Sequence, residues 1–110
     1  PEPALAVAKY IKANIKDVGM RISAKAGFLA DPEDTLAIEN LKALKVTKVT
    51  YAPIDTWTSE NWYKVGLVGK PERLDEVRDE LRAVFGNIFT YVKSSLQLLE
   101  VTGPTAQRRR

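Results

Sequence analysis

The chain of 110 residues has the size of a single domain, and its 45% hydrophobic and 28% charged residues are ordinary proportions for a globular protein. Cysteine and histidine are both absent, which excludes disulfides, a thiolate nucleophile, a Cys/His zinc site and a Ser-His-Asp triad. The net charge of +3 equals the contribution of Arg108, Arg109 and Arg110. The rest of the chain is therefore close to neutral, so we do not expect a nucleic-acid partner.

The chain contains no run of about 18 apolar residues, and its beginning lacks an apolar segment followed by a cleavage site. We therefore expect no membrane partner and a cytoplasmic location. The spacing of the glycines at 66 and 69 matches neither the Walker A pattern nor the dinucleotide-binding fingerprint. The carboxylates around the tryptophans, Asp55 and Glu60, belong to a polar turn where pKa values stay ordinary. The sequence thus predicts no catalytic residue, no cofactor and no metal.

The first half of the chain predicts a helix, a strand and a second helix. Residues 1–17 place Leu5, Ala8, Ile11 and Ile15 at helical spacing. Residues 18–25 alternate apolar and polar side chains as a half-buried strand does, and residues 26–30 form a connection. Residues 31–45 predict a helix with Asp31 as its N-cap and Pro32 at its first position.

The middle of the chain predicts a hairpin of two strands, residues 46–54 and 61–69, which are rich in β-branched and aromatic residues. With Thr58–Asn61 as a four-residue turn, Trp57 and Trp62 become opposed residues at its base. Such a pair either fixes the strand register or anchors a partner.

Residues 70–86 have the clearest helical pattern, with Pro71 near the start and Gly86 just past the end. Residues 87–101 predict a long strand whose alternation changes phase at Ser94–Ser95, through a bulge or a break into two strands. Residues 102–110 predict a basic, flexible tail.

This order predicts an α+β chain with a ferredoxin-like βαββαβ fold: a four-stranded antiparallel sheet with two helices on one face, plus an extra N-terminal helix. The expected parts are the N-terminal helix (1–17), the ferredoxin-like domain (18–101) and the tail (102–110). Apolar groups on the open sheet face predict a homo-oligomer, or assembly with larger enzyme subunits. The interface candidates are Trp57, Trp62, Tyr51, Phe89 and Tyr91.

The segment from residue 25 to residue 44 resembles the small PurS subunit of formylglycinamidine ribonucleotide synthetase. A lysine-glycine-leucine strand end leads there through Asp-Pro into a helix, and the matching positions are Lys25, Gly27, Leu29, Asp31, Pro32, Ile38 and Leu41. The resemblance extends over residues 20–101. It implies a ferredoxin-like fold, sheet-to-sheet oligomerisation and a non-catalytic role that bridges a glutaminase and a synthetase.

Three hypotheses follow for the function. The favoured one is a non-catalytic accessory subunit of a larger enzyme complex, so that the chain itself is not an enzyme. The second is an ACT-like regulatory domain that senses a small molecule between subunits. The third is an RNA-associated protein that uses the tail contacts Arg108, Arg109 and Arg110.

Overall fold

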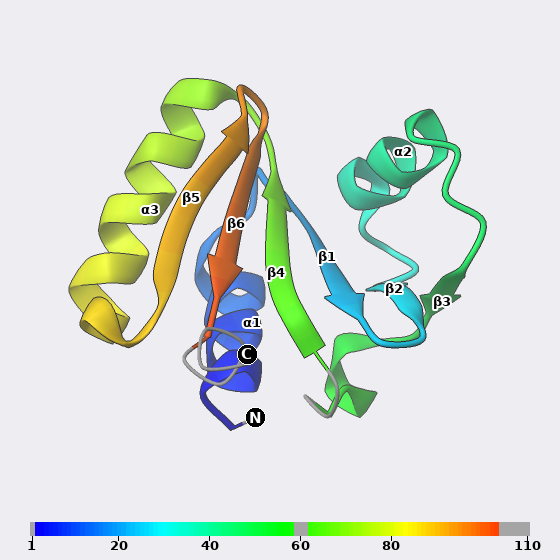
Figure 1. Ribbon diagram of the computed structural model, residues 1–110, viewed down its shortest axis with the longest axis horizontal. Helices are drawn as coiled ribbons and strands as arrows, with labels where there is room; N and C mark the ends of the chain where they lie inside the picture. The colour runs from blue at the N-terminus through cyan, green and yellow to red at the C-terminus, as the bar shows by residue number, and fades with distance from the viewer. Residues whose placement is uncertain (1, 59–61, 104–110) are drawn as a thin grey trace.

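The computed structural model describes residues 2–58 and 62–103 (Figure 1). Its helices are α1 (Glu2–Asn14), α2 (Thr35–Ala43) and α3 (Pro71–Phe85). Its strands are β1 (Gly19–Ala24), β2 (Gly27–Ala30), β3 (Val49–Tyr51), β4 (Trp62–Val68), β5 (Thr90–Ser95) and β6 (Leu98–Thr102), with 3-10 turns η1 (Ile54–Thr56) and η2 (Gly86–Ile88). The predicted boundaries between the three parts of the chain stay predictions, and most of the predicted tail lies outside the described residues.

The strands form one mixed sheet of six strands in the order β3-β2-β1-β4-β6-β5. Strands β2 and β3 are parallel, and every other neighbouring pair is antiparallel. The predicted ferredoxin-like fold, with four antiparallel strands and two helices, is therefore wrong. The additional strands come from the segment predicted as a connection and from the division of the last predicted strand.

Strand β2 replaces the predicted connection at residues 26–30. It returns directly after β1 through a two-residue turn, so that Ala24 pairs with Gly27. Gly27 has φ +127°, and a Cβ there would lie 2.5 Å from the carbonyl oxygen of Lys48. The tight turn and the close approach of the chain before β3 both require glycine at this position.

Strands β5 and β6 occupy the predicted strand of residues 87–101. The chain turns at Leu96 and Gln97, and the β5–β6 pairing shifts register between Lys93 and Ser95. The phase change that the sequence showed at Ser94–Ser95 is therefore the end of one strand of a hairpin.

Helices α1 and α3 pack against one face of the sheet and enclose the larger core. Their buried side chains meet alternate residues of the central strands, such as Ile22 of β1 and Leu67 of β4. Each fully buried aliphatic side chain contributes about 1.5–3 kcal/mol to folding. The N-terminal helix therefore belongs to the same core as the sheet; its buried residues are Val7, Ala8 and Ile11.

Helix α2 packs against the opposite face, over β1 and β2, where Ala37 and Leu41 meet Ala30 in a smaller core. The approach is close, because a Cβ on Gly19 would lie 2.6 Å from the Ala37 nitrogen. On this second face α2 approaches β1 and β4, at the end of the sheet away from α3 (Figure 1).

Candidate functional site

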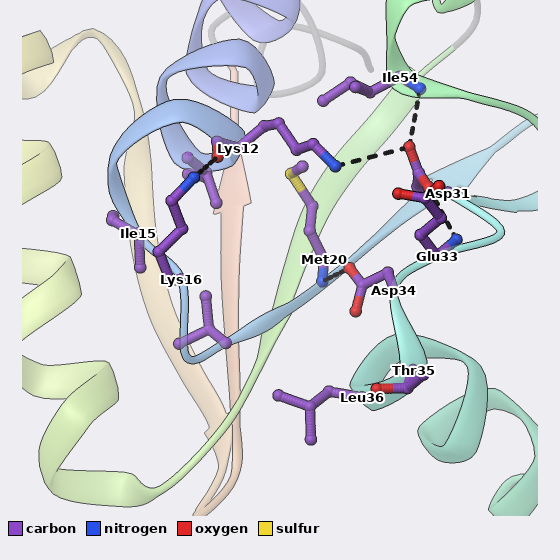
Figure 2. Close-up of a pocket in the computed structure, with 12 residues that line it drawn as sticks. Lys12, Ile15, Lys16, Met20, Asp31, Glu33, Asp34, Thr35, Leu36 and Ile54 are labelled. Carbon is purple, nitrogen blue, oxygen red and sulfur yellow. Dashed lines mark hydrogen bonds and ion pairs between the residues drawn. The ribbon is translucent and has the colours of Figure 1, made fainter.

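A pocket of about 220 Å³ opens between α1, the start of β1, the β2–α2 connection and η1 (Figure 2). Its apolar floor includes the buried residues Ile11, Ile15 and Ile54, whereas the exposed Lys12 and Lys16 stand at its rim. The two lysines are four residues apart on α1, which places them on the same side of the helix. The pocket therefore combines an apolar base with charged groups at its mouth.

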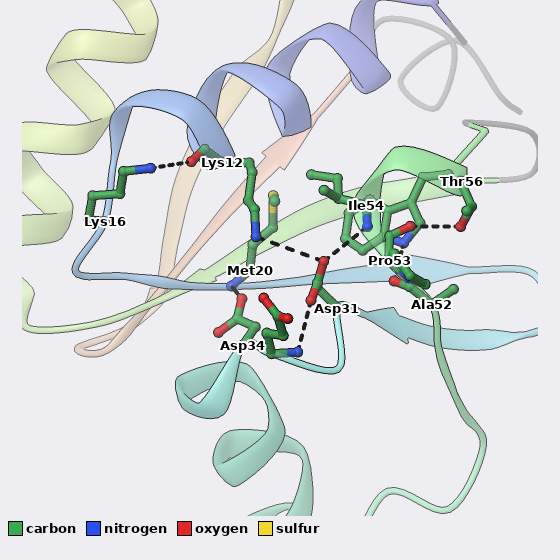
Figure 3. Close-up of polar contacts among 11 residues, drawn as sticks. Lys12, Lys16, Met20, Asp31, Asp34, Ala52, Pro53, Ile54 and Thr56 are labelled. Atoms are coloured by element: carbon green, nitrogen blue, oxygen red, sulfur yellow. Dashed lines mark hydrogen bonds and ion pairs between the residues drawn. The ribbon is translucent and has the colours of Figure 1, made fainter.

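The Asp31 carboxylate forms the centre of the polar contacts beside the pocket (Figure 3). Its Oδ1 accepts a hydrogen bond from the Glu33 nitrogen at 2.8 Å, and its Oδ2 accepts one from the Ile54 nitrogen at 3.0 Å. The Lys12 ammonium lies 3.9 Å from the same Oδ2. Asp31 is buried, and these donors compensate its charge by tying the β2–α2 connection to η1.

Asp34 is the N-cap of α2, and the predicted cap at Asp31 is wrong. The Asp34 Oδ1 accepts a hydrogen bond from the Ala37 nitrogen at 3.0 Å, and the Asp34 Oδ2 accepts one from the Met20 nitrogen at 2.8 Å. Strand β2 ends at Ala30, opposite Arg21, so β2 offers no further backbone acceptor to β1. The Asp34 carboxylate takes that place and accepts the hydrogen bond of the Met20 nitrogen. Asp31 instead holds the turn that precedes the helix, because its side chain bonds the backbone two residues on.

The Lys12 and Lys16 ammonium groups keep donors available for a ligand. Lys16 donates to the Lys12 carbonyl oxygen at 2.9 Å, and the Lys12 side chain is half exposed beside Asp31. An ammonium has three donors, so neither group is saturated by these contacts. The exposed Glu33 carboxylate also lines the pocket, so the mouth offers partners for a ligand group of either sign.

The two aspartates of the pocket serve the fold. The chain has no histidine or cysteine. The carboxylates of Asp31 and Asp34 already accept backbone hydrogen bonds that hold the fold together. Within residues 2–58 and 62–103, no three carboxylates come together in a way that could hold a metal ion. The arrangement can bind and orient a small molecule.

The two tryptophans contact each other, but not as hairpin partners. Their rings meet edge to face at 6.0 Å, and Trp57 is buried in the larger core, where its Nε1 donates to the Ala52 oxygen at 2.9 Å. Strands β2 and β1 lie between β3 and β4, so the predicted pairing of residues 46–54 with 61–69 is wrong. Most of the predicted turn, residues 59–61, lies outside the described residues.

The other interface candidates lie at the two edges of the sheet, with Tyr51 on β3 and with Phe89 and Tyr91 at β5. Tyr51 is 45% exposed on the edge strand β3, whereas Phe89 is buried beside Phe85. Tyr91 donates from its hydroxyl to the Gly86 oxygen at 2.9 Å. Burial raises the pKa of Tyr91, and Arg82, which lies over its ring, opposes that rise. A role of these residues in an interface stays a prediction, as does the predicted homo-oligomer.

The structure does not describe the predicted tail contacts, since Arg108, Arg109 and Arg110 lie outside the described residues. No helix in the described part of the chain is long and apolar enough to cross a membrane. Sequence reasoning assigned no site to Lys12 and Lys16 of the first helix, which line the pocket. It missed Asp34, although an Asp before a threonine and an apolar stripe was a signal for a later helix start.

Comparison with known proteins gives structural matches alone. No protein-family model and no curated protein matches the sequence. The solved structure of TM0651 from Thermotoga maritima matches with a TM-score of 0.75 and 22% identity, over 98% of this chain and 42% of that one. A haloacid dehalogenase-like hydrolase from Bacteroides thetaiotaomicron matches with a TM-score of 0.70 and 15% identity, over 93% and 38%. SMU.1108c from Streptococcus mutans UA159 matches with a TM-score of 0.77 and 11% identity, over 93% and 39%.

These matches correct the functional predictions. The resemblance to PurS is not supported, because nearly the whole chain superimposes on parts of other proteins, one of them named as a hydrolase. The predicted non-catalytic accessory subunit is contradicted by the same finding, and so is the statement that the chain is not an enzyme. The ACT-like alternative is lost with the ferredoxin-like topology. The chain spans about two fifths of the length of the structures that it matches, with which it shares its fold.

Proposed function

We propose that the chain is one structural unit of a haloacid dehalogenase-like hydrolase, in which the pocket between α1 and α2 takes part in substrate binding. The observation that carries this proposal is the match of 93% of the chain to 38% of a hydrolase of that kind. A unit of this size supplies part of an enzyme, and the residues of its pocket favour a role in substrate binding.

The residues around the pocket support binding of a substrate. The apolar floor, including Ile11 and Ile15, suits the carbon skeleton of a small organic molecule, while Lys12 and Lys16 offer donors to an anionic group. The carboxylates of Asp31 and Asp34 keep the walls of the pocket in place, because each joins two segments of the chain.

The test measures hydrolysis by the complete polypeptide in which these residues occur. The substrate panel contains p-nitrophenyl phosphate, p-nitrophenyl acetate and 2-chloropropionate, each with and without added divalent cations. We expect turnover of at least one of these compounds. Failure of all three would refute the assignment to a hydrolase.

Lys12→Ala then tests the pocket itself. Loss of one charge-assisted contact to the substrate costs about 1.5 kcal/mol, so KM should rise about tenfold while kcat is retained. Lys9→Ala is the matched control, because Lys9 is exposed on the same helix and does not line the pocket. An unchanged KM in Lys12→Ala would exclude the pocket from substrate binding, even if the protein is a hydrolase.

A further inference from the structure

Arg21 is the buried cation among the described residues, with 7% of its surface exposed. It lies on β1 between Met20 and Ile22, so its side chain belongs to the sheet face opposite the pocket. Its guanidinium carbon lies 5.0 Å from the centre of the Phe28 ring. This stacking fixes the plane of the guanidinium but satisfies none of its N–H donors in the plane.

The hydrogen-bonding capacity of Arg21 is not used by the described residues. Its Nε is buried and has no acceptor there, and no described carboxylate lies within 4.0 Å of the guanidinium. Burial lowers the pKa of Arg21, which nevertheless stays charged in a protein. Glu100 attracts this charge through space, but a buried N–H donor without an acceptor is costly, so its retention calls for an acceptor from elsewhere.

The surroundings of Arg21 carry a positive balance. Arg21 pairs with Gly66 of β4, and Gly66 pairs with Glu100 of β6, so no side chain stands between Arg21 and Glu100 in this row of the sheet. Glu100 is itself engaged by Lys64, whose ammonium lies 3.2 Å from its carboxylate. Two cations and one carboxylate leave a net charge of +1 in this part of the face.

We propose that Arg21 and Lys64 bind the oxyanion of a small molecule, a carboxylate or a phosphate, on the sheet face opposite the larger core. An oxyanion is the partner that matches a planar guanidinium, because its oxygens accept two parallel N–H bonds. Lys64 supplies a second cation from the neighbouring strand and keeps Glu100 from repelling the ligand. This site lies on the other side of the sheet from the pocket, and its occupancy does not depend on hydrolysis.

The test follows the Nε–Hε signal of Arg21 by NMR in the complete protein while inorganic phosphate or acetate is added. The signal is assigned through bonds to its own backbone, so the measurement needs no variant. We expect it to shift saturably with at least one of the two anions, and the anion that shifts it identifies the preferred oxyanion. A signal that stays in place with both anions at about 50 mM, where even weak binding is visible, would overturn the proposal.

Variants test whether the guanidinium itself binds. Arg21→Gln should raise the dissociation constant about tenfold or more, because it removes charge-assisted hydrogen bonds. Arg82→Gln is the matched control, since Arg82 also lies over an aromatic ring, at 5.3 Å from Tyr91, but on α3. Equal affinity in Arg21→Gln and the parent protein would overturn the proposal; if Arg21→Gln does not fold, the Arg21 signal of the parent protein decides.

Discussion

The Asp34 carboxylate joins α2 to β1, and its removal should destabilise the whole fold. Asp34→Ala deletes the cap bond to the Ala37 nitrogen and the bond to the Met20 nitrogen. Loss of a helix cap costs about 1 kcal/mol. Loss of a charged acceptor for a partly buried N–H costs a further ~1.5–3 kcal/mol. The expected decrease in the free energy of unfolding is therefore about 2.5–4 kcal/mol.

Urea denaturation followed by circular dichroism measures this decrease. For a chain of this length the melting temperature should fall by about 10–16 °C, at roughly 4 °C for each kcal/mol. Asp34→Asn should lose only the second contribution, about 1.5–3 kcal/mol, because an amide oxygen can still cap the helix while its NH₂ cannot accept from Met20. Glu33→Ala is the control, since Glu33 contributes its backbone nitrogen and not its side chain to the contacts of Asp31. An Asp34→Ala variant within 0.5 kcal/mol of the parent protein, a difference typical of neutral surface changes, would refute this reasoning.

Two further predictions concern other contacts between elements. Gly19→Ala should lower the free energy of unfolding by about 1–3 kcal/mol, because its Cβ would meet the Ala37 nitrogen at 2.6 Å. Gly66→Ala, whose Cβ would find its nearest atoms at 3.4 Å, should not show this loss in the same urea titration. At Asp75, the hydrogen bond from Lys93 lowers the pKa below its usual value of 3.8. The resulting stabilisation is present above that value and is lost as pH falls through the folded-state pKa, so Asp75→Asn should weaken the acid-induced decrease in the urea midpoint. An identical decrease in both proteins would contradict the assignment.

The three helices could be predicted from the sequence because each carries its own local signals. In α3, Pro71 stands at the N-terminus and Gly86 caps the C-terminus with φ +72°, as the pattern indicated. The charged pair Asp75–Arg78, whose residues are three positions apart on this helix, forms at 3.6 Å. These interactions lie within a few residues, so a single sequence contains all the information that they need.

The order of the strands could not be predicted in the same way. Four-residue β2 is too short to show alternation, and its place beside β1 depends on a turn that glycine at 27 permits. Once β2 occupies the edge of β1, β3 must pair with β2 rather than with β4. The contact of Trp57 with Trp62 was predicted from a pairing of β3 with β4, which the sheet does not contain. The two rings nevertheless meet, because both pack in the larger core.

The candidate site depends on contacts between residues that are distant in sequence. Asp31 bonds Ile54, twenty-three positions away, and no periodicity in the sequence links the two residues. In the sequence Arg21 resembles an ordinary polar residue of an alternating strand, because the sequence does not reveal that its side chain is buried against Phe28. Burial of a charge is thus the feature that only the fold can supply.

Strand β1 connects the two binding surfaces that we propose. Met20 faces the pocket and is fixed by Asp34 through its backbone nitrogen, while the next residue, Arg21, faces the other side of the sheet. Successive side chains of a strand point in opposite directions, so one hydrogen bond to β1 positions groups on both faces. The carboxylate that begins α2 therefore aligns the floor of the pocket and the guanidinium together, although the two surfaces share no ligand-binding side chain.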